Sequence, residues 1–155
     1  MAGEKQEYQI EIVNRKAKFL YHFVQSFEAG VMLSGTEIKS IRMGNANLTD
    51  AYCVVNKGEV FIKSMYISVY KQGGHHNHEP RRTRKLLLGK GEIKKITRRL
   101  QEKGQALIPY RLYINARGLA KLEIALASGK KSFDKRHSIK EKDQKRDLDR
   151  SMKLK

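Results

Sequence analysis

The chain has 155 residues, of which 39% are hydrophobic, a size and composition that suit one ordinary globular domain. It contains no apolar run of about 18 residues, and segment 1–13 lacks the basic-then-apolar layout of a signal peptide, so we expect a cytoplasmic protein without a membrane partner. The 33 Lys and Arg residues outnumber the 16 Asp and Glu residues and leave a net charge of +17. So strong a positive charge favours a polyanionic partner, of which nucleic acid is the usual one, over an anionic membrane surface or an acidic protein.

Hydrophobic patterning predicts a body of short strands with a few helices. Lys57-Gly58 is a turn signal that joins two of the strands into a hairpin. Ser34 and Glu37 have the spacing of a capping box, which begins a helix that ends at Gly44. In chain order, the expected elements are strands 19–27 and 30–33, a helix at 36–43, strands 51–56 and 59–65, one turn of helix at 84–88, a helix at 93–100, and strands 106–114 and 121–126.

The last two strands carry further detail. Pro109 cannot donate a ladder hydrogen bond, so it indicates an edge strand or a bulge. Leu122, Ile124 and Leu126 alternate with other residues, which is the period of a strand with one buried face. Gly118 lies in the turn between the two strands.

The C-terminal segment differs from the body in composition. Residues 128–155 hold 11 Lys or Arg and 5 acidic residues with few large apolar side chains. Such a segment cannot bury enough surface to offset its ordering entropy, so we expect a tail that is disordered alone and helical only on a partner. The prediction is therefore a mainly β fold. In residues 1–127, many short strands with few helices suggest a small antiparallel barrel, of which the oligonucleotide-binding (OB) barrel is one basic example, although periodicity alone does not choose that topology. Residues 128–155 form the basic tail.

Catalytic patterns are missing from the sequence, which predicts that the protein is not an enzyme. It has no phosphate-binding Gly-Lys-Ser/Thr loop, no Gly-x-Ser-x-Gly and no paired Cys motif. His75, His76 and His78 follow two glycines, and we interpret them as part of a solvated loop rather than as a metal site. The single cysteine, Cys53, is expected to be a buried small hydrophobic residue. A nuclease is the enzymatic alternative, but no carboxylate cluster supports it.

Two basic segments are candidates for phosphate contact. Residues 81–85 carry four positive charges next to an apolar anchor at 86–88, which favours phosphate binding over a solvated helix face. The charges of the helix at 94–99 lie opposite its apolar residues, as on any surface helix, so that segment remains open between the two interpretations. Glu28 is an exception on a basic surface. It would need a base amino group or a nearby Arg to be useful to RNA, and it is otherwise an ordinary surface acid.

Seven sequence blocks in order resemble the SmpB family of SsrA-binding proteins. Each block is weak alone, but their order and spacing along residues 14 to about 146 are highly specific. The blocks are Asn14-Arg15-Lys16-Ala17, Phe27-Glu28-Ala29-Gly30, Gly35-Thr36-Glu37-Ile38-Lys39-Ser40, Gly44-Asn45-Ala46-Asn47-Leu48, Arg82-Thr83-Arg84-Lys85-Leu86-Leu87-Leu88, Gly129-Lys130-Lys131 and Asp134-Lys135-Arg136.

The resemblance implies a fold, which is an OB-type antiparallel barrel with about three helices and a C-terminal tail that is unstructured in solution. It also implies a function and a set of partners. Such a protein binds the tRNA-like domain of tmRNA (SsrA RNA) and delivers it to stalled bacterial ribosomes for trans-translation, ribosome rescue and tagging of the nascent chain for degradation. The implied partners are tmRNA, alanyl-tmRNA with EF-Tu and GTP, and the A site of the 70S ribosome with small-subunit ribosomal RNA. The protein would act as a monomer without a cofactor or a metal.

The resemblance also implies which residues act. The family's RNA-contact positions fall on Asn14, Glu28, Leu87 and Lys121, to which we add the neighbouring cations Arg15, Lys16, Lys39, Arg84 and Lys85 and the basic turn Gly129, Lys130 and Lys131. The tail residues implied for the decoding centre and the mRNA channel are Asp134, Lys135, Arg136, His137, Ile139 and Lys140.

One alternative from another class stays open at this stage. A basic, barrel-shaped ribosome assembly protein would share the charge and the tail, but it would have no preference for a tRNA-like RNA.

Overall fold

A closed antiparallel sheet forms the body of the protein. The computed structural model describes residues 10–102 and 104–153, except for the side chains of residues 132–134. The elements are β1 (Glu11–Val13), α1 (Arg15–Leu20), β2 (Tyr21–Val31), α2 (Gly35–Arg42), β3 (Ala46–Asn47), β4 (Tyr52–Asn56), β5 (Glu59–Lys63), β6 (Tyr66–Ile67), the 3₁₀ segment η1 (Lys71–His76), β7 (Arg84–Leu87), α3 (Lys90–Leu100), β8 (Gln105–Ile114), β9 (Ala120–Gly129) and α4 (Ser132–Lys153).

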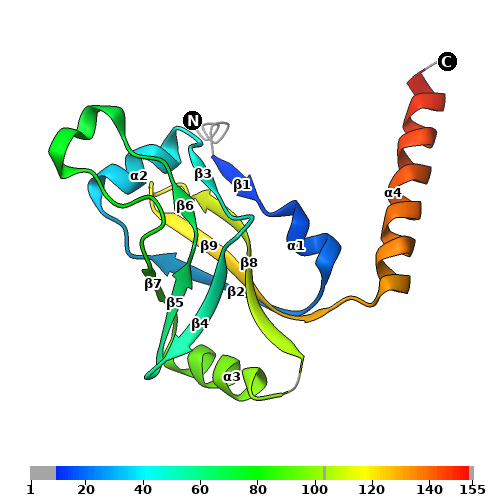
Figure 1. Cartoon of the computed structure of the whole chain (residues 1–155), viewed down its shortest axis with the longest axis horizontal. Coiled ribbons are helices and arrows are strands. Elements are labelled where there is room, and N and C mark those ends of the chain that lie inside the picture. The colour runs from blue at the N-terminus through cyan, green and yellow to red at the C-terminus, as the bar shows by residue number, and fades with distance from the viewer. Residues whose placement is uncertain (1–9, 103, 154–155) are drawn as a thin grey trace, which may run out of the picture.

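The strand order explains the closure. The main sheet runs β1-β8-β4-β5-β7-β2-β9, and β8 pairs with β9 as well as with β4, so six strands form a ring to which β1 is added. β3 and β6 form a separate two-stranded sheet. Helices α2 and α3 lie at opposite ends of the ring, while α4 projects away from it (Figure 1). The predicted mainly β fold with antiparallel strands is therefore confirmed.

The apolar core fills the inside of the ring. Side chains from all six of its strands and from both end helices meet there. Ile41 of α2 and Ile96 of α3 have no exposed surface, so each helix closes one end of the barrel by burying one apolar stripe. A second, smaller cluster lies outside the ring, where Ala17 of α1 packs against Ile108 and Ala127.

Several local predictions are confirmed. β4 and β5 form the expected hairpin, and both turn residues, Lys57 and Gly58, have positive φ as a tight primed turn requires. The register of β8 shifts between Pro109 and Arg111, which is the bulge that proline indicated. In α2, the Glu37 carboxylate accepts a hydrogen bond from the Ser34 backbone N–H at 2.8 Å, as in a capping box.

Two segments differ from the prediction. Residues 84–87 form strand β7 rather than a turn of helix, because β7 pairs with β5 and with β2 to complete the ring. Residues 19–20 belong to helix α1 rather than to the following strand. The predicted alternation of the last strand also fails in its second half, where residues 124–127 are all buried. The cause is α1, whose Ala17 covers the outer face of the sheet there.

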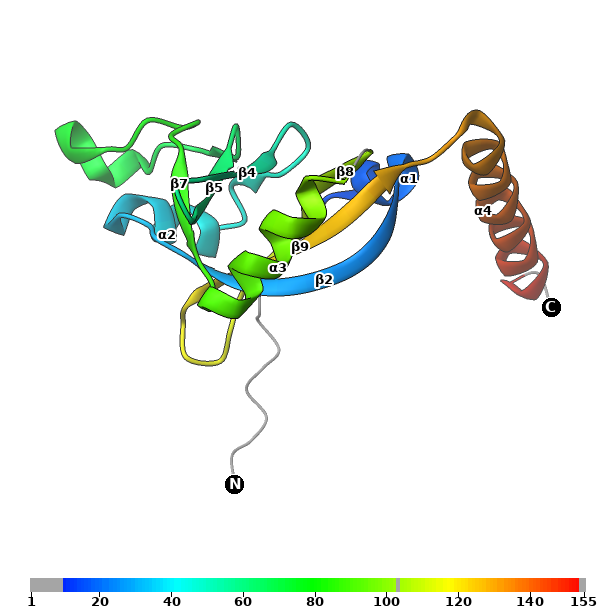
Figure 2. The same cartoon turned by 90° about the horizontal axis from the view of Figure 1, so that it is seen from below.

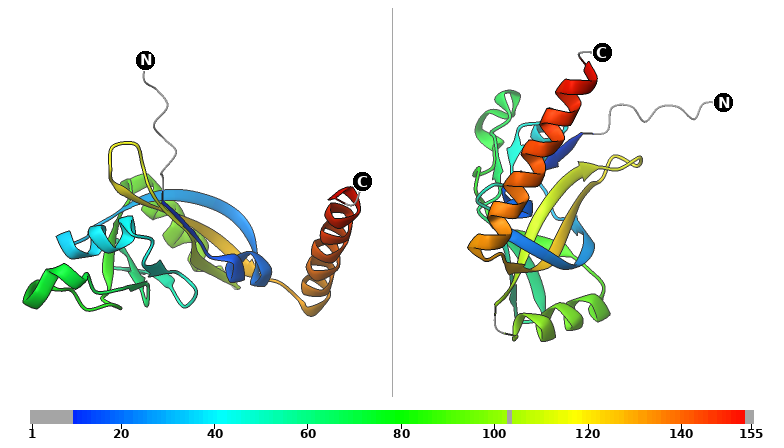
Figure 3. Two further views of the ribbon diagram at one scale, coloured as in Figure 1. Left: turned by 90° about the horizontal axis from the view of Figure 1, so that it is seen from above. Right: turned by 90° about the vertical axis from the view of Figure 1, so that its right-hand side faces the viewer.

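The described part of the tail forms a helix in this structure; that the tail is disordered in the free chain and becomes helical only on a partner stays a prediction. β9 extends to Gly129, two residues beyond the predicted boundary, and the 22-residue helix α4 follows. Eight of the 22 residues of α4 are Lys or Arg, which favour helix locally. Ion pairs three residues apart, such as Arg146 with Asp143 and Arg150 with Asp147, add weak support. α4 contacts α1 and otherwise stands apart from the sheet (Figure 3).

Candidate nucleic-acid interface

One row of residues crosses four neighbouring strands on the open half of the outer sheet face. Register places Tyr113 of β8 opposite Lys121 of β9, Lys121 opposite Gly30 of β2, and Gly30 opposite Leu87 of β7. Residues that lie directly opposite in antiparallel strands share a face of the sheet. Lys121 and Leu87, which are distant in sequence, therefore flank the same glycine, and Leu87 is 51% exposed.

Gly30 has no side chain, so the sheet surface is low at this position between Lys121 and Leu87. A Cβ atom at this position would lie 3.4 Å from the Leu87 Cβ, so a larger residue would crowd the leucine side chain. Without a side chain, the strand leaves its backbone open to close approach by a flat group. A cation on one side and an exposed apolar side chain on the other are suited to a phosphate and to the face of a base or sugar.

Glu28 lies in the next row of the same face and is held in place by its neighbours. The Tyr113 hydroxyl donates a hydrogen bond to Glu28 Oε2, and burial together with this bond raises the pKa of Tyr113 to about 12. Arg111 lies 4.2 Å over the Tyr113 ring and is itself bound by Glu11 at 2.6 Å and by Glu123 at 2.9 Å. A carboxylate fixed in this way still has lone pairs to accept hydrogen bonds from a base amino group.

Asn14 has a structural role as the N-cap of α1, and its contact with RNA stays a prediction. Its side-chain nitrogen donates to the carbonyl oxygens of Leu48 and Pro109 at 3.2 and 3.1 Å, and its side-chain oxygen accepts from the Ala17 N–H. Only 3% of its surface is exposed, and together with Lys16 it lines a pocket of about 290 Å³. Its neighbours Arg15 and Lys16 are exposed at the start of α1.

Arg84 is also buried, contrary to the prediction that it faces phosphate. Its side chain has no exposed surface, and its guanidinium binds the equally buried carboxylate of Glu37 and the carbonyl oxygens of Met65 and Pro80 at 2.7 and 3.1 Å. Arg82 donates to the same carboxylate at 2.6 Å. The basic segment therefore contributes to the core through Arg84 and locks β7 to α2.

The environment of Glu37 stabilises its charged form. Burial alone would raise its pKa, but hydrogen bonds from Arg82, the Ser34 N–H and Arg84 outweigh the burial and lower the pKa of Glu37 to about 2. The carboxylate consequently stays ionised under all ordinary conditions. This buried pair was missed in the sequence because its two members are 47 residues apart.

Two further cations that were predicted to bind RNA, Lys85 and Lys39, each have a local partner. Lys85 is half-buried and pairs with Glu59 at 3.3 Å. Lys39 is exposed on α2, and its ammonium lies 5.4 Å from the centre of the Tyr70 ring. Lys85 lies two residues before Leu87 and therefore on the same face of β7 as the row, whereas Lys39 lies on α2.

The histidine loop follows the separate sheet of β3 and β6. His78 bridges the Thr36 hydroxyl and the Ile67 carbonyl oxygen, each at 2.9 Å, and so fastens the loop to α2. His75 and His76 are exposed. Among residues 10–102 and 104–153, no three His, Cys, Asp or Glu side chains gather as a metal site requires. No helix in that part of the chain is both long and apolar enough to cross a membrane.

The basic turn connects the sheet to α4. Gly129 ends β9 opposite Tyr21, and Lys130 bonds through its N–H to the Leu20 carbonyl and through Nζ to the Ser138 hydroxyl, each at 2.9 Å. Lys131 is exposed in the same turn. The predicted tail residues with described side chains all lie in the first half of α4 and are exposed or half-buried: Lys135, Arg136, His137, Ile139 and Lys140. The side chain of Asp134 is outside the described part of the structure.

Comparison with known proteins gives consistent matches over most of the chain. The family model "SmpB protein" matches residues 11–154. An SsrA-binding protein of Desulforamulus reducens is 52% identical over 90% of this chain and 86% of its own length, and one of Parabacteroides distasonis is 49% identical over 97% and 98%. A chain solved in work on tmRNA–SmpB and the center of the bacterial ribosome superposes with a TM-score of 0.68 at 39% identity, covering 79% of this chain and 86% of that one.

Proposed function

Because this chain belongs to the SmpB family, we propose that it binds the tRNA-like domain of tmRNA and delivers it to stalled ribosomes for trans-translation. The observation that carries the proposal is that the family match extends from the first strand of the sheet through α4. Both the sheet body and the tail thus have counterparts in relatives whose names state SsrA binding.

We assign the RNA-binding role to the row across β8, β9, β2 and β7 and to the carboxylate beside it. Lys121 would contact a phosphate, Leu87 would pack against a base or sugar, and Glu28 would accept a hydrogen bond from a base amino group. Arg15 and Lys16 are placed to extend phosphate contact at the other end of the sheet. Arg84 supports the fold and has no direct part in binding, and Asn14, as the N-cap of α1, positions Arg15 and Lys16.

The tail would act after this first binding step. Asp134 to Lys140 would enter the decoding centre and the mRNA channel, and Lys130 with Gly129 and Lys131 would set the angle at which α4 leaves the sheet. A basic helix can follow the channel only where no mRNA occupies it, which would give selectivity for stalled ribosomes. We propose that the protein works as a monomer in the cytoplasm with alanyl-tmRNA, EF-Tu and GTP, and that it binds rather than catalyses.

A gel-shift experiment tests the binding step. The tRNA-like domain of tmRNA is titrated with the full chain at two salt concentrations, with tRNA as competitor. Tight binding that resists tRNA is expected, and Lys121→Ala should weaken it, whereas binding that collapses with salt and shows no preference would favour a general ribosomal RNA-binding protein.

A truncation tests the tail. A chain that ends before Asp134 should still bind the tRNA-like domain, because the sheet is complete at Gly129. It should fail to support tagging on ribosomes stalled at the end of a message without a stop codon. Tagging at the normal rate by the truncated chain would show that the tail has been assigned the wrong role.

A further inference from the structure

Two carboxylates lie directly opposite each other on the face that we assign to RNA. Register pairs Glu28 of β2 with Glu123 of β9, and these two strands run side by side along the sheet (Figure 2). Residues in this relation have Cβ atoms about 4.5–5.5 Å apart, and like charges directly opposite each other destabilise the pair. A neighbouring group must relieve this repulsion if both carboxylates are to stay ionised and in place.

Arg111 of β8 relieves the repulsion from the other side of β9. Register places it opposite Glu123, so Glu28, Glu123 and Arg111 form one row across three strands. The Arg111 guanidinium donates to Glu123 Oε1 at 2.9 Å and, through Nε, to Glu11 Oε1 at 2.6 Å. Because β9 lies between β8 and β2, the bond to Arg111 holds Glu123 on the side that faces away from Glu28.

Tyr113 holds Glu28 at the other end of the same arrangement. Its hydroxyl donates to Glu28 Oε2, and its ring lies 4.2 Å from the Arg111 guanidinium carbon. Arg111 therefore stacks on the ring that carries the donor to Glu28 and also restrains the carboxylate that opposes Glu28. A Glu123 side chain freed from Arg111 would face Glu28 across the strand pair and repel it from Tyr113 into solvent.

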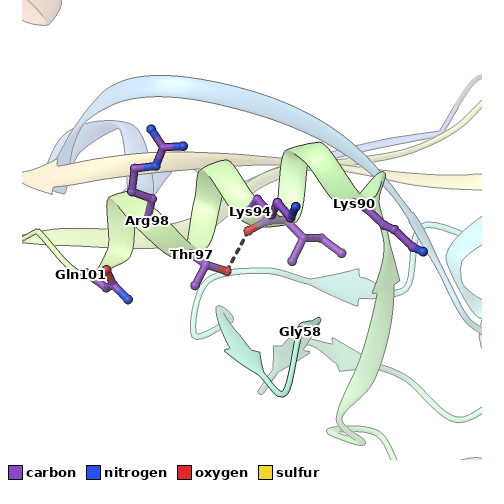
Figure 4. Close-up of a pocket in the computed structure, with 7 residues that line it drawn as sticks. Gly58, Lys90, Lys94, Thr97, Arg98 and Gln101 are labelled. Atoms are coloured by element: carbon purple, nitrogen blue, oxygen red, sulfur yellow. Dashed lines mark hydrogen bonds between the residues drawn. The ribbon is translucent and has the colours of Figure 1, made fainter.

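Arg111 differs in this respect from the cations of α3. Lys94 and Arg98 line a groove of about 570 Å³ between α3 and the tip of the β4–β5 hairpin (Figure 4), and neither forms an ion pair within the described part of the chain. Arg111 instead presents a planar fork of donors whose geometry is fixed. Glu11 and Glu123 occupy that fork, so Arg111 organises other side chains rather than a phosphate.

We propose that Arg111 is a positioning residue of the RNA interface. By binding Glu123, it prevents that carboxylate from repelling Glu28, and Glu28 stays at Tyr113 with lone pairs left for a base amino group. The inference rests on the proposed function, because it takes Glu28 as a contact to the tRNA-like domain. It adds that the strength of this contact depends on two residues, Arg111 and Glu123, that do not themselves touch the RNA.

Two double variants with the same net charge test this role. Arg111→Gln removes the cation, and Glu123→Gln added to it removes the carboxylate that the cation restrains. Arg111→Gln with Glu102→Gln is the matched control, because Glu102 is an exposed carboxylate that pairs with Arg99 and with neither Arg111 nor Tyr113. Each full-length chain is titrated against the tRNA-like domain at one salt concentration, and thermal unfolding checks that the fold persists.

The proposal predicts that only one of the two second changes restores binding. Arg111→Gln should weaken binding by at least about fivefold, and Glu123→Gln should return the affinity to within about twofold of the wild type. Glu102→Gln should restore little. Unchanged binding in Arg111→Gln overturns the proposal. Equal recovery in both double variants would mean that only net charge matters, and no recovery in either would mean that Arg111 contacts RNA itself or supports the fold; each of these results also overturns it.

A tyrosine titration tests the same arrangement without RNA. Burial and the hydrogen bond to Glu28 raise the pKa of Tyr113 to about 12, and the charge of Arg111 acts against this rise. Loss of the cation alone would therefore raise the pKa of Tyr113 further, whereas loss of the bond to Glu28 would lower it. The pKa should fall in Arg111→Gln and return to about 12 when Glu123→Gln is added; a pKa in Arg111→Gln that stays at this value or rises overturns the proposal.

The two hypotheses fail in distinguishable ways. A wild-type chain that shows no preference for the tRNA-like domain over tRNA would contradict the proposed function, while the titration of the RNA-free variants would still decide whether Arg111 keeps Glu28 in place.

Discussion

Replacing Glu37 with glutamine should destabilise the fold strongly at neutral pH. Glu37 and Arg84 both have no exposed surface, so the variant leaves a guanidinium buried without its counter-charge. Breaking a buried pair from one side costs about 3–5 kcal/mol. The pKa gives a similar size, because a shift of the Glu37 pKa from 4.5 to about 2 corresponds to roughly 3 kcal/mol of stabilisation by the ionised carboxylate.

The pH dependence follows from the direction of that shift. The pKa of Glu37 is lower in the folded chain than in the unfolded chain, so its stabilisation is complete above pH 4.5 and is lost as the pH falls towards 2. Between pH 7 and pH 3 the wild type should lose about 2 kcal/mol of this contribution, whereas the variant has no such carboxylate to protonate. The difference in unfolding free energy between the two proteins should therefore narrow at pH 3.

Urea unfolding of both proteins at pH 7 and pH 3 measures this difference. Glu59→Gln is the matched control, because it removes the carboxylate from an exposed pair with Lys85 and should cost no more than about 1 kcal/mol. The reasoning is refuted if Glu37→Gln is as mild as the control at pH 7, or if its cost is unchanged at pH 3.

Three further predictions concern the row across the sheet and the tail. Gly30→Val should weaken binding of the tRNA-like domain at least about tenfold by crowding Leu87, with the thermal midpoint little changed; unchanged affinity in a gel shift would remove this row from the interface. Tyr113→Phe frees Glu28 from its hydrogen bond and should lower the affinity for the tRNA-like domain by about two- to tenfold. In a spectrophotometric titration, the variant should lack a tyrosine with a pKa of about 12. An unaltered titration would show that Tyr113 is not held as described. The amides of α4 should exchange with solvent far faster than those of β9, because α4 depends mostly on local contacts; equal protection would mean that the tail is a fixed part of the fold.

Patterns of a few adjacent residues correctly predicted the local structures that those residues form. The spacing of Ser34 and Glu37, the turn residues Lys57 and Gly58, and Pro109 each indicate a backbone conformation that depends on adjacent residues. The cap, the hairpin and the bulge are all present. Prediction at this level works because the deciding interactions span only a few residues.

The structures that were predicted wrongly depend on contacts between residues that are far apart in the sequence. Residues 84–87 read as a basic turn of helix, but ring closure requires them as a strand, and the partner of Arg84 lies on a helix 47 residues earlier. Likewise, the side-chain amide of Asn14 donates to the Pro109 carbonyl at 3.1 Å, a bond that the sequence did not indicate. Charge and polarity identify groups that can bind a ligand, and only the fold decides whether another part of the chain already occupies them.

The distribution of the positive charge also bears on how one small domain could engage two RNAs. If the net charge of +17 were spread evenly over the surface, every face would bind RNA with similar affinity. The protein could then not hold one RNA on one face and a second RNA on another. Instead, the open face of β2 and β9 balances its cations with fixed carboxylates, so affinity there depends on matching base and sugar groups as well as phosphates. In α4, eight Lys and Arg residues outnumber five Asp and Glu residues, and this excess of positive charge suits a large and continuous phosphate surface. Because non-specific phosphate contacts weaken steeply with salt while matched contacts do so less, the two kinds of surface should separate in a salt titration of the same protein.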